Sequence, residues 1–495
     1  MVDVALVKGE KIQEAIPMYD SVKVVKQALD LLGGMESFVK KDDYVVIKPN
    51  YGVPIPRKHY AVPLSTSPGV IEGIILEAQR AGARKVGIAE GLPRTGMVRS
   101  KAMLKKNETS YNMVFTACGG MMLKEKYPDF VELRLLEIEP RTKMELPGAS
   151  VMKEFNMWQA FIDCDLFINV PIMKTHFITG CATLAIKNLH GIVGDYMHLA
   201  HRNDFWMAKV DISKWLIDNN KWRLTVIDGL AALEGNGPGP MGKQVDMGVI
   251  VASSDFVAAD TVAMATMGLN ALEQPGDTLA AWKGLGTVDL KKIEVKGAKI
   301  DDVKRPFLRP NINILGRWPN IEVILGGVCD HCKGWLAMEV DSFFKSIRRK
   351  AARAVKKIKT LPEAVAKALT EFSQEELLAN LDPGQTLKIV EENTPPESED
   401  KKQKKARKLL LELADHLRVL TVPTQIFIGD NPPKPSEFVE RVVFVGDCCI
   451  GTARNIKQLR AIQTHADGQW SEKRWIVFHG CPPMDAFEFP SYLRT

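Results

Sequence analysis

Short apolar, β-branched runs alternate with amphipathic stretches along roughly the first half of the chain. The expected strands span residues 4–7, 44–47, 85–89, 166–170, 224–227 and 248–252. The expected helices span residues 21–32, 67–80 and 258–267. Strands that alternate with helices at this spacing are typical of βαβ units around a mainly parallel sheet. The pattern therefore predicts an α/β fold in which helices flank the sheet.

Two helix starts are marked by their local sequences. Ser67 precedes Pro68, and a serine N-cap followed by proline at the first helical position is typical of a helix start. Asp255 and Asp260 lie around the start of the helix expected near residue 258, where carboxylates favour a helix N-terminus. We expect Ser67, Asp255 and Asp260 to act as capping residues.

The pattern changes near residue 300, beyond which prolines interrupt the apolar runs. Compact strands are expected there at 323–325, 442–445 and 475–478. A charge-rich helical segment occupies about 341–420 between the first and second of these strands. We therefore expect an α/β domain at 1–300 and a smaller C-terminal α/β domain at 301–495, which carries the basic helical segment as an insertion.

Cysteines follow each of the three expected strands of the second domain. Cys329 and Cys332 form a C-x-x-C pair, Cys448 and Cys449 are adjacent, and Cys481 precedes a proline. Glycines flank each group, an arrangement that can present several thiolates at one edge of a sheet. A C-x-x-C pair by itself is compatible with a redox dithiol, a zinc site or an iron–sulfur cluster.

The dispersed spacing favours a cluster over zinc. Zinc sites more often consist of two short C-x-x-C pairs, and a cysteine followed by proline resembles the closing ligand of bacterial ferredoxins. Neighbouring side chains of a strand point to opposite faces, so we prefer Cys448 and keep Cys449 as its alternative. The predicted ligands of a [4Fe–4S] cluster, or of zinc, are Cys329, Cys332, Cys448 and Cys481. The remaining cysteines, expected as buried thiols, are Cys118, Cys164 and Cys181.

Polar side chains follow several expected strands of the first domain. Ligands of open α/β sheets bind beyond the carboxyl ends of the strands, where loop amides and helix N-termini gather. General acid/base chemistry by a histidine and a carboxylate is reasonable at such a place. The candidate catalytic residues are His176, Lys174 and Glu234. The candidate ligand-binding residues are Lys48, Asn50, Lys187, Asn188 and Asp228.

Neither common nucleotide-binding loop is present. The glycine-rich run that begins at Asp228 lacks the order of a P-loop, and no G-x-G-x-x-G follows the first strand. Histidines are concentrated instead, since His176, His190, His198 and His201 fall within 26 residues. His198 and His201 have the spacing of one helical face, which leaves a metal or anion site open beside capping and surface roles.

Several short motifs of the first domain form an ordered series. They are Ile47–Asn50, Thr66–Gly69, Asn169–His176, Ala185–Asn188, Asp228–Pro238 and Ser254–Asp260. By these motifs the chain resembles the domain of unknown function 362 family. Members of that family often occur in iron–sulfur proteins with a ferredoxin-type module, so the resemblance implies a cluster. This chain has no compact run of four cysteines, so its cluster would need the dispersed set.

Composition excludes several classes of protein. The 66 Lys and Arg residues exceed the 60 Asp and Glu residues by only 6 in a chain of 495, which argues against a dedicated nucleic-acid binder. Eight cysteines are too few for a disulfide scaffold. No apolar run reaches the ~18 residues of a spanning helix, and the N-terminus lacks the regions of a secretion signal. We therefore expect a cytoplasmic protein.

A basic stretch lies at 345–359, where apolar residues recur at helical spacing on the opposite face. Such a helix can dock on an anionic membrane surface or on an acidic electron-carrier protein, or it can be an ordinary solvated helix face.

These features together predict a cytoplasmic iron–sulfur protein. Its second domain would hold the cluster, and its first domain would bind an anionic small molecule as a redox or cluster-dependent enzyme. The alternative is a zinc-stabilised or metal-free protein that binds a ligand or serves as a scaffold without redox activity.

Overall fold

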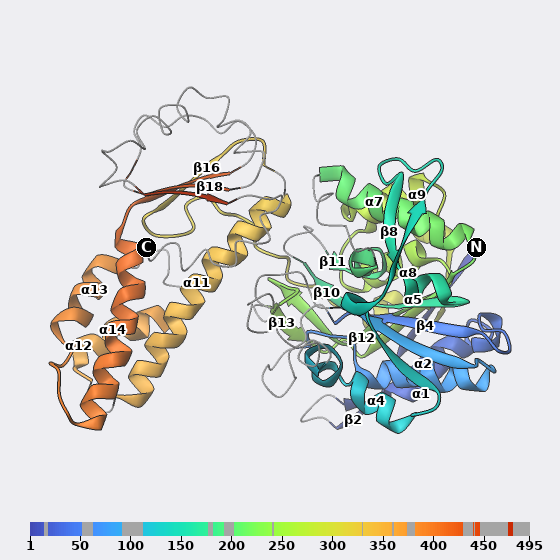
Figure 1. Ribbon diagram of the computed structural model, residues 1–495, viewed down its shortest axis with the longest axis horizontal. Helices are drawn as coiled ribbons and strands as arrows, with labels where there is room; N and C mark the ends of the chain where they lie inside the picture. The colour runs from blue at the N-terminus through green and yellow to red at the C-terminus, as the bar shows by residue number, and fades with distance from the viewer. Residues whose placement is uncertain are drawn as a thin grey trace. The chain divides into compact units, whose positions relative to one another are not determined.

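The computed structural model divides the chain into two compact units, Met1–Asn311 and Ile312–Thr495. The two units are described separately below and are shown as ribbons in Figure 1. The described residues are 1–13, 18–51, 63–91, 112–176, 182–192, 202–239, 242–328, 330–358, 361–373, 382–428, 439, 441–445 and 474–478.

The described residues of the first unit form an 11-stranded sheet. Its main path is β15 (Ile293–Gly297), β1 (Val2–Lys8), β14 (Val249–Ser253), β12 (Trp222–Gly235), β9 (Leu166–Val170), β4 (Tyr44–Pro49), β5 (Lys85–Glu90) and β6 (Val131–Leu135). The strands beside this path are β10 (Ile172–Thr175), β11 (Ala182–Thr183) and β13 (Gly242–Val245). Strands β12, β9, β4, β5 and β6 run parallel, whereas β14 is antiparallel to both of its neighbours. The predicted α/β fold with a mainly parallel sheet is confirmed.

Helices cover both faces of this sheet (Figure 1). One face packs on α1 (Ser21–Asp30), α2 (Pro68–Arg80) and α4 (Gly120–Lys126). The other face packs on α5 (Gln159–Asp163), α6 (Ala185–Asn188), α7 (Arg202–Asp218), α8 (Phe256–Thr266), α9 (Pro275–Trp282) and α10 (Ile300–Val303). Val45 and Ile47 of β4 point into the first core and Tyr44 and Val46 into the second, as strand geometry requires. Both faces are buried, so the central strands read as continuous apolar runs.

Two short ribbons accompany the sheet. The strands of the first are β2 (Lys11–Gln13) and β3 (Met18–Tyr19), and those of the second are β7 (Arg141–Glu145) and β8 (Glu154–Trp158).

The helix starts differ in part from the sequence expectation. The Asp255 carboxylate caps α8 by accepting a hydrogen bond from the N–H of Ala258, as expected. The Ser67 side chain makes no capping bond at α2, and the Ser67 N–H instead donates to Asp228 at 2.7 Å. Asp260 lies inside α8 and caps a different helix, α6, through the N–H groups of Ala185 and Ile186. A distant acceptor or helix can thus replace the partner that local sequence suggests.

The second unit contains a sheet of four parallel strands among its described residues. The strands, in spatial order, are β16 (Ile321–Leu325), β17 (Thr424–Ile428), β18 (Arg441–Val445) and β19 (Arg474–Phe478). Four helices are described between β16 and β17, and we call them the helical arm. They are α11 (Asp330–Lys357), α12 (Glu363–Ser373), α13 (Pro383–Glu392) and α14 (Lys401–Thr421). The arm and the small sheet share one core, to which Phe343, Leu369 and Leu417 of the arm and Ile426 of β17 contribute.

None of the helices among the described residues is both long enough and apolar enough to cross a bilayer.

Candidate functional site

The carboxyl ends of β4, β5 and β9 meet at one edge of the large sheet. Lys48 of β4 pairs in register with Asn169 of β9, and Glu90 ends the neighbouring strand β5. These polar side chains are buried, with 2% of Lys48, 5% of Glu90 and none of Asn169 exposed. Charged and amide groups cost free energy in such a place unless they are paired, so their partners define the site.

Lys48 and Glu90 form a buried ion pair. The Lys48 ammonium lies 3.0 Å from Oε2 and 3.1 Å from Oε1 of Glu90 and also donates to the carbonyl of Pro49. The backbone N–H groups of Tyr51 and Gly91 donate to the same carboxylate. A Cβ on Gly191 would lie 3.3 Å from both Glu90 Oε1 and Lys48 Cε, so the loop after α6 closes tightly over the pair. The Glu90 charge is therefore fully compensated by groups already in place.

Three asparagines form a hydrogen-bonded chain that begins at Lys174. The Lys174 ammonium donates to Asn50 Oδ1 at 2.7 Å and to the carbonyl of Leu64 at 3.0 Å. Asn50 Nδ2 donates to Asn188 Oδ1, and Asn188 Nδ2 donates to Asn169 Oδ1, both at 2.8 Å. Asn169 Nδ2 completes the chain on the carbonyl of Ala185 at 2.8 Å. This hydrogen-bonded chain connects β10, the residue after β4, α6 and β9, and it orients Lys174.

Lys174 titrates near neutrality. Its side chain is 1% exposed, and this burial lowers the pKa of the ammonium to about 7, with the positive charges of Lys187 and Lys48 acting in the same direction. Lys174 can therefore hold or release a proton at physiological pH, which is the property required of a general acid or base.

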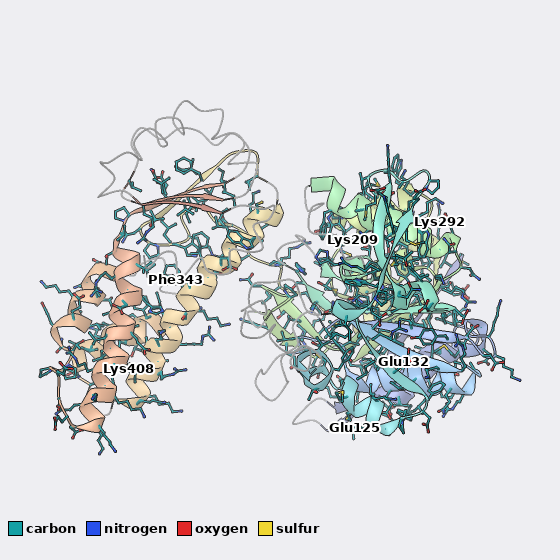
Figure 2. All side chains as sticks on the ribbon, viewed as in Figure 1. Glu125, Glu132, Lys209, Lys292, Phe343 and Lys408 are labelled. Atoms are coloured by element: carbon teal, nitrogen blue, oxygen red, sulfur yellow. The ribbon has the colours of Figure 1, made fainter. Side chains whose placement is uncertain are left out.

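Lys187 adds a further positive charge to the site. It is half-buried on α6, and burial, together with the charge of Lys48, lowers its pKa to about 8. Its ammonium lies 5.8 Å from the ring centre of Phe205 and makes no hydrogen bond to any described residue. Lys209 of α7 is fully buried and is labelled in Figure 2; its ammonium lies 3.0 Å from the centre of the same ring. Burial and the charge of Lys187 hold the pKa of Lys209 well below its ordinary value. Positive charge therefore exceeds negative charge at this edge.

Two of the clustered histidines belong to the same region. His176 is buried at the end of β10, and His190 lies 5.5 Å from the Phe205 ring. Burial and the charges of Lys187 and Lys209 hold the pKa of His190 well below its usual value, so its imidazole is neutral. His198 and His201 lie outside the described residues.

The two carboxylates expected in the glycine-rich run are engaged with backbone. Asp228 accepts hydrogen bonds from the N–H groups of Ser67 and Leu230, so it ties α2 to β12. Glu234 accepts the N–H of Leu308 at 2.9 Å. The predicted catalytic role of Glu234 with His176 stays a prediction.

A buried pair of carboxyl groups, Asp260 and Asp277, lies at the start of α6. Asp260 binds the first N–H groups of α6 at 2.8 and 3.2 Å, and the carboxyl of Asp277 on α9 interacts with that of Asp260. Neither side chain is exposed. Burial and the proximity of the two carboxyl groups raise the pKa of Asp277, and burial raises that of Asp260. The pair therefore retains a proton that isolated carboxyl groups would lose.

Sequence reasoning missed Lys209 and Asp277. Lys209 shares one face of α7 with Phe205, Ala208 and Ile212, and a lysine on an apolar helix face is a signal of a buried cation. No comparable signal marks Asp277, because its partner Asp260 belongs to another helix.

The strands that precede the predicted metal ligands share one edge of the small sheet. Leu325, Ile428, Val445 and Phe478, which end β16 to β19, are aligned in parallel register. Cys332 is buried in the first turn of α11, whereas Cys329, Cys448, Cys449 and Cys481 lie outside the described residues. Within the described part of the chain, no three His, Cys, Asp or Glu side chains are grouped to hold a metal ion. Cys118 and Cys164 are buried thiols, and Cys181 is not described.

The fold and the edge of the large sheet define an α/β protein with a buried, lysine-rich site held by asparagines. Residues 45–265 match the model of the family described as Domain of unknown function (DUF362), which confirms the resemblance expected from the sequence motifs. The chain is 27% identical over 270 residues to the thylakoid-associated protein sll1697 of Synechocystis sp., an alignment that covers 53% of this chain and 74% of that protein.

A solved structure also resembles the chain over most of its length. It is the lactate racemase apoprotein of Thermoanaerobacterium thermosaccharolyticum, with a TM-score of 0.33 and 11% sequence identity over 97% of this chain and 93% of the other.

Proposed function

We propose that the first unit binds an anionic small molecule at the carboxyl edge of its large sheet. The observation that carries the proposal is the ammonium of half-buried Lys187, which has no hydrogen-bond acceptor among the described residues. The charge of Lys187 interacts unfavourably with those of Lys48, Lys174 and Lys209, and the nearby Glu90 carboxylate is already bound by four hydrogen bonds. A carboxylate or phosphate group would supply the missing acceptor and the missing negative charge.

Anion binding would also change the protonation of the site. A negative charge next to Lys174 stabilises its ammonium form, so a bound anion raises the pKa of Lys174 from about 7. Lys174 therefore takes up a proton when the anion binds. The asparagine chain holds the ammonium in place while its charge changes. Lys174 is therefore our choice for the group that gives a proton to, or takes one from, the bound molecule, with His176 as the second candidate.

The test is calorimetric titration of the full chain with inorganic phosphate and with malonate. We expect at least one of these anions to bind, and we expect Lys187→Gln to weaken binding about tenfold or more, because a charge-assisted hydrogen bond is lost. Lys214→Gln is the matched control, since Lys214 is an exposed lysine of α7 that pairs with Asp218. Equal affinity in the two variants, or no binding of either anion by the wild type, would contradict the proposal.

We further propose that the second unit holds a [4Fe–4S] cluster through Cys329, Cys332, Cys448 and Cys481. The supporting observation is the register of the small sheet, because the cysteine-bearing segments leave β16, β18 and β19 at one aligned edge. Four thiolates are a sufficient ligand set for such a cluster. The bound cluster would supply one-electron chemistry, which would make the chain an iron–sulfur oxidoreductase.

Anaerobic purification with iron, sulfide and zinc analysis tests this second proposal. We expect iron and sulfide together with an absorption band near ~400 nm that bleaches on reduction. Cys329→Ser should remove the band, whereas Cys164→Ser, at a buried thiol of the first unit, should keep it. Stoichiometric zinc without sulfide would favour the zinc-stabilised protein, and a metal-free protein whose thiols titrate would favour a redox dithiol.

A further inference from the structure

Positive charge is concentrated at the end of the helical arm where α11 ends and α14 begins. The exposed basic side chains of α11 and α14 at this end are Arg353, Lys356, Lys357, Lys401, Lys402, Lys404, Lys405 and Lys408. None of these eight side chains forms an ion pair or a side-chain hydrogen bond with a described residue. We call this set the basic tip.

The packing of the arm brings the two halves of the basic tip together. Phe343 stacks on His416 at 6.1 Å, and further along α11 the Lys350 ammonium lies 3.5 Å from Glu412. The later residue of α11, Lys350, thus contacts the earlier residue of α14, Glu412, so the two helices are antiparallel. The end of α11 and the start of α14 therefore lie at the same end of the arm, where Figure 2 labels Lys408.

Local helix energetics do not account for these lysines. Cations are favourable in the last turn of a helix and unfavourable in the first, where the backbone dipole is positive. Lys356 and Lys357 end α11, but Lys401, Lys402 and Lys404 begin α14, whose first turn contains no acidic residue. Glu397, Glu399 and Asp400 precede this turn, and Asp400 is engaged as the helix cap. The start of α14 thus carries charges that destabilise it, which indicates a role outside the helix.

We propose that the basic tip is a docking surface for a membrane with anionic lipid headgroups. Seven of its eight side chains are lysines, which act as point charges on a diffuse negative surface rather than as bidentate readers of defined groups. The aromatic side chains of the arm, Trp335, Phe343, Phe344 and Phe372, are all buried, so none is available to stack on nucleic-acid bases. Val355 and Leu411 are exposed beside the basic residues and suit the apolar part of a bilayer interface.

The experiment is co-sedimentation of the full chain with phosphatidylcholine vesicles that contain or lack phosphatidylglycerol. We expect binding only to the anionic vesicles, and we expect added salt to weaken it because the attraction is screened. The test variant changes Lys401, Lys402, Lys404, Lys405 and Lys408 to Gln. The control variant changes Lys153, Lys291, Lys292, Lys299 and Lys304, which are exposed lysines of the first unit, to Gln.

Both variants lose five positive charges, so their net charge falls equally, from +6 to 6 − 5 = +1. Glutamine has nearly the helix propensity of lysine, and thermal unfolding checks that both variants keep the wild-type fold. The proposal requires that the test variant bind about tenfold or more weakly than the control. It is overturned if both variants bind alike, if neutral vesicles bind as well, or if the chain binds polyglutamate or duplex DNA but no vesicle.

Discussion

The ammonium of Lys174 and the side-chain carbonyl of Asn50 are joined by a hydrogen bond of 2.7 Å across 124 residues of chain. Asn50 then donates to Asn188, a further 138 residues away from it in sequence. A buried lysine whose pKa is near 7 is thus oriented by a chain of neutral amides. Neutral partners leave the charge of Lys174 free to respond to a ligand, which a carboxylate partner would prevent.

Removal of the Asn50 amide should destabilise the first unit. Asn50→Leu leaves the Lys174 ammonium and Asn188 Oδ1 without one partner each, and a buried polar group left unsatisfied costs about 1–3 kcal/mol. Chemical denaturation measures this loss. Asn219→Leu, at an exposed asparagine with a single hydrogen bond to Trp215, should cost less than about 1 kcal/mol. Equal losses of unfolding free energy in the two variants would show that the amide chain stabilises the unit no more than an exposed asparagine does.

The stability of the first unit should rise with pH through Lys174. Between the folded pKa of about 7 and the ordinary value of 10.5, the unfolded chain holds a proton that the folded chain has lost. The free energy of unfolding therefore rises by up to about 1.4 kcal/mol per pH unit in this range. Below this range the contribution of Lys174 does not change with pH.

The Lys174→Met variant lacks this titration. We expect the unfolding free energy of the wild type, measured relative to this variant, to increase steadily from neutral to alkaline pH. A difference between the two proteins that does not change with pH would contradict the lowered pKa.

The buried carboxyl pair should have the opposite effect. Burial and mutual proximity raise the pKa of Asp277, and burial raises that of Asp260, so the folded protein keeps a proton that the unfolded chain loses above the usual carboxyl pKa. Stability from this pair is therefore greatest in acid and falls as pH rises. In Asp277→Asn the decline should flatten, whereas Asp218→Asn, at an exposed residue of α7, should keep it. Parallel pH profiles of wild type and Asp277→Asn would contradict this.

A branched side chain at Gly191 should destabilise the first unit. A Cβ at this position already lies 3.3 Å from Glu90 and Lys48, so Gly191→Val forces the buried ion pair apart. We expect a loss of about 1–3 kcal/mol on overpacking, measured by denaturant unfolding. Gly239→Val is the control, because no atom of the described residues lies within 4 Å of its Cβ position, and it should change stability by less than about 0.5 kcal/mol. A Gly191 variant as stable as this control would argue against close packing on the pair.

The sequence by itself determined the strands and helices whose patterns are local. The apolar runs of β4, β5 and β9 and the helix start at Asp255 all appear where the pattern indicates, because burial on both faces of a parallel sheet leaves a continuous apolar signal. The residues at the ends of these strands were identified for the same reason, since ligands bind beyond the carboxyl ends of such strands.

Only the tertiary structure decided how those residues interact. Local sequence suggested Ser67 and Asp260 as caps of nearby helices. Instead, the Asp228 carboxylate on β12 accepts the Ser67 N–H, and Asp260 accepts N–H groups at the start of α6. The Lys48–Glu90 pair, the asparagine chain and the Asp260–Asp277 pair each join groups on different elements. Their energies depend on distance and burial after folding, and neither quantity is encoded in the spacing of residues along the chain.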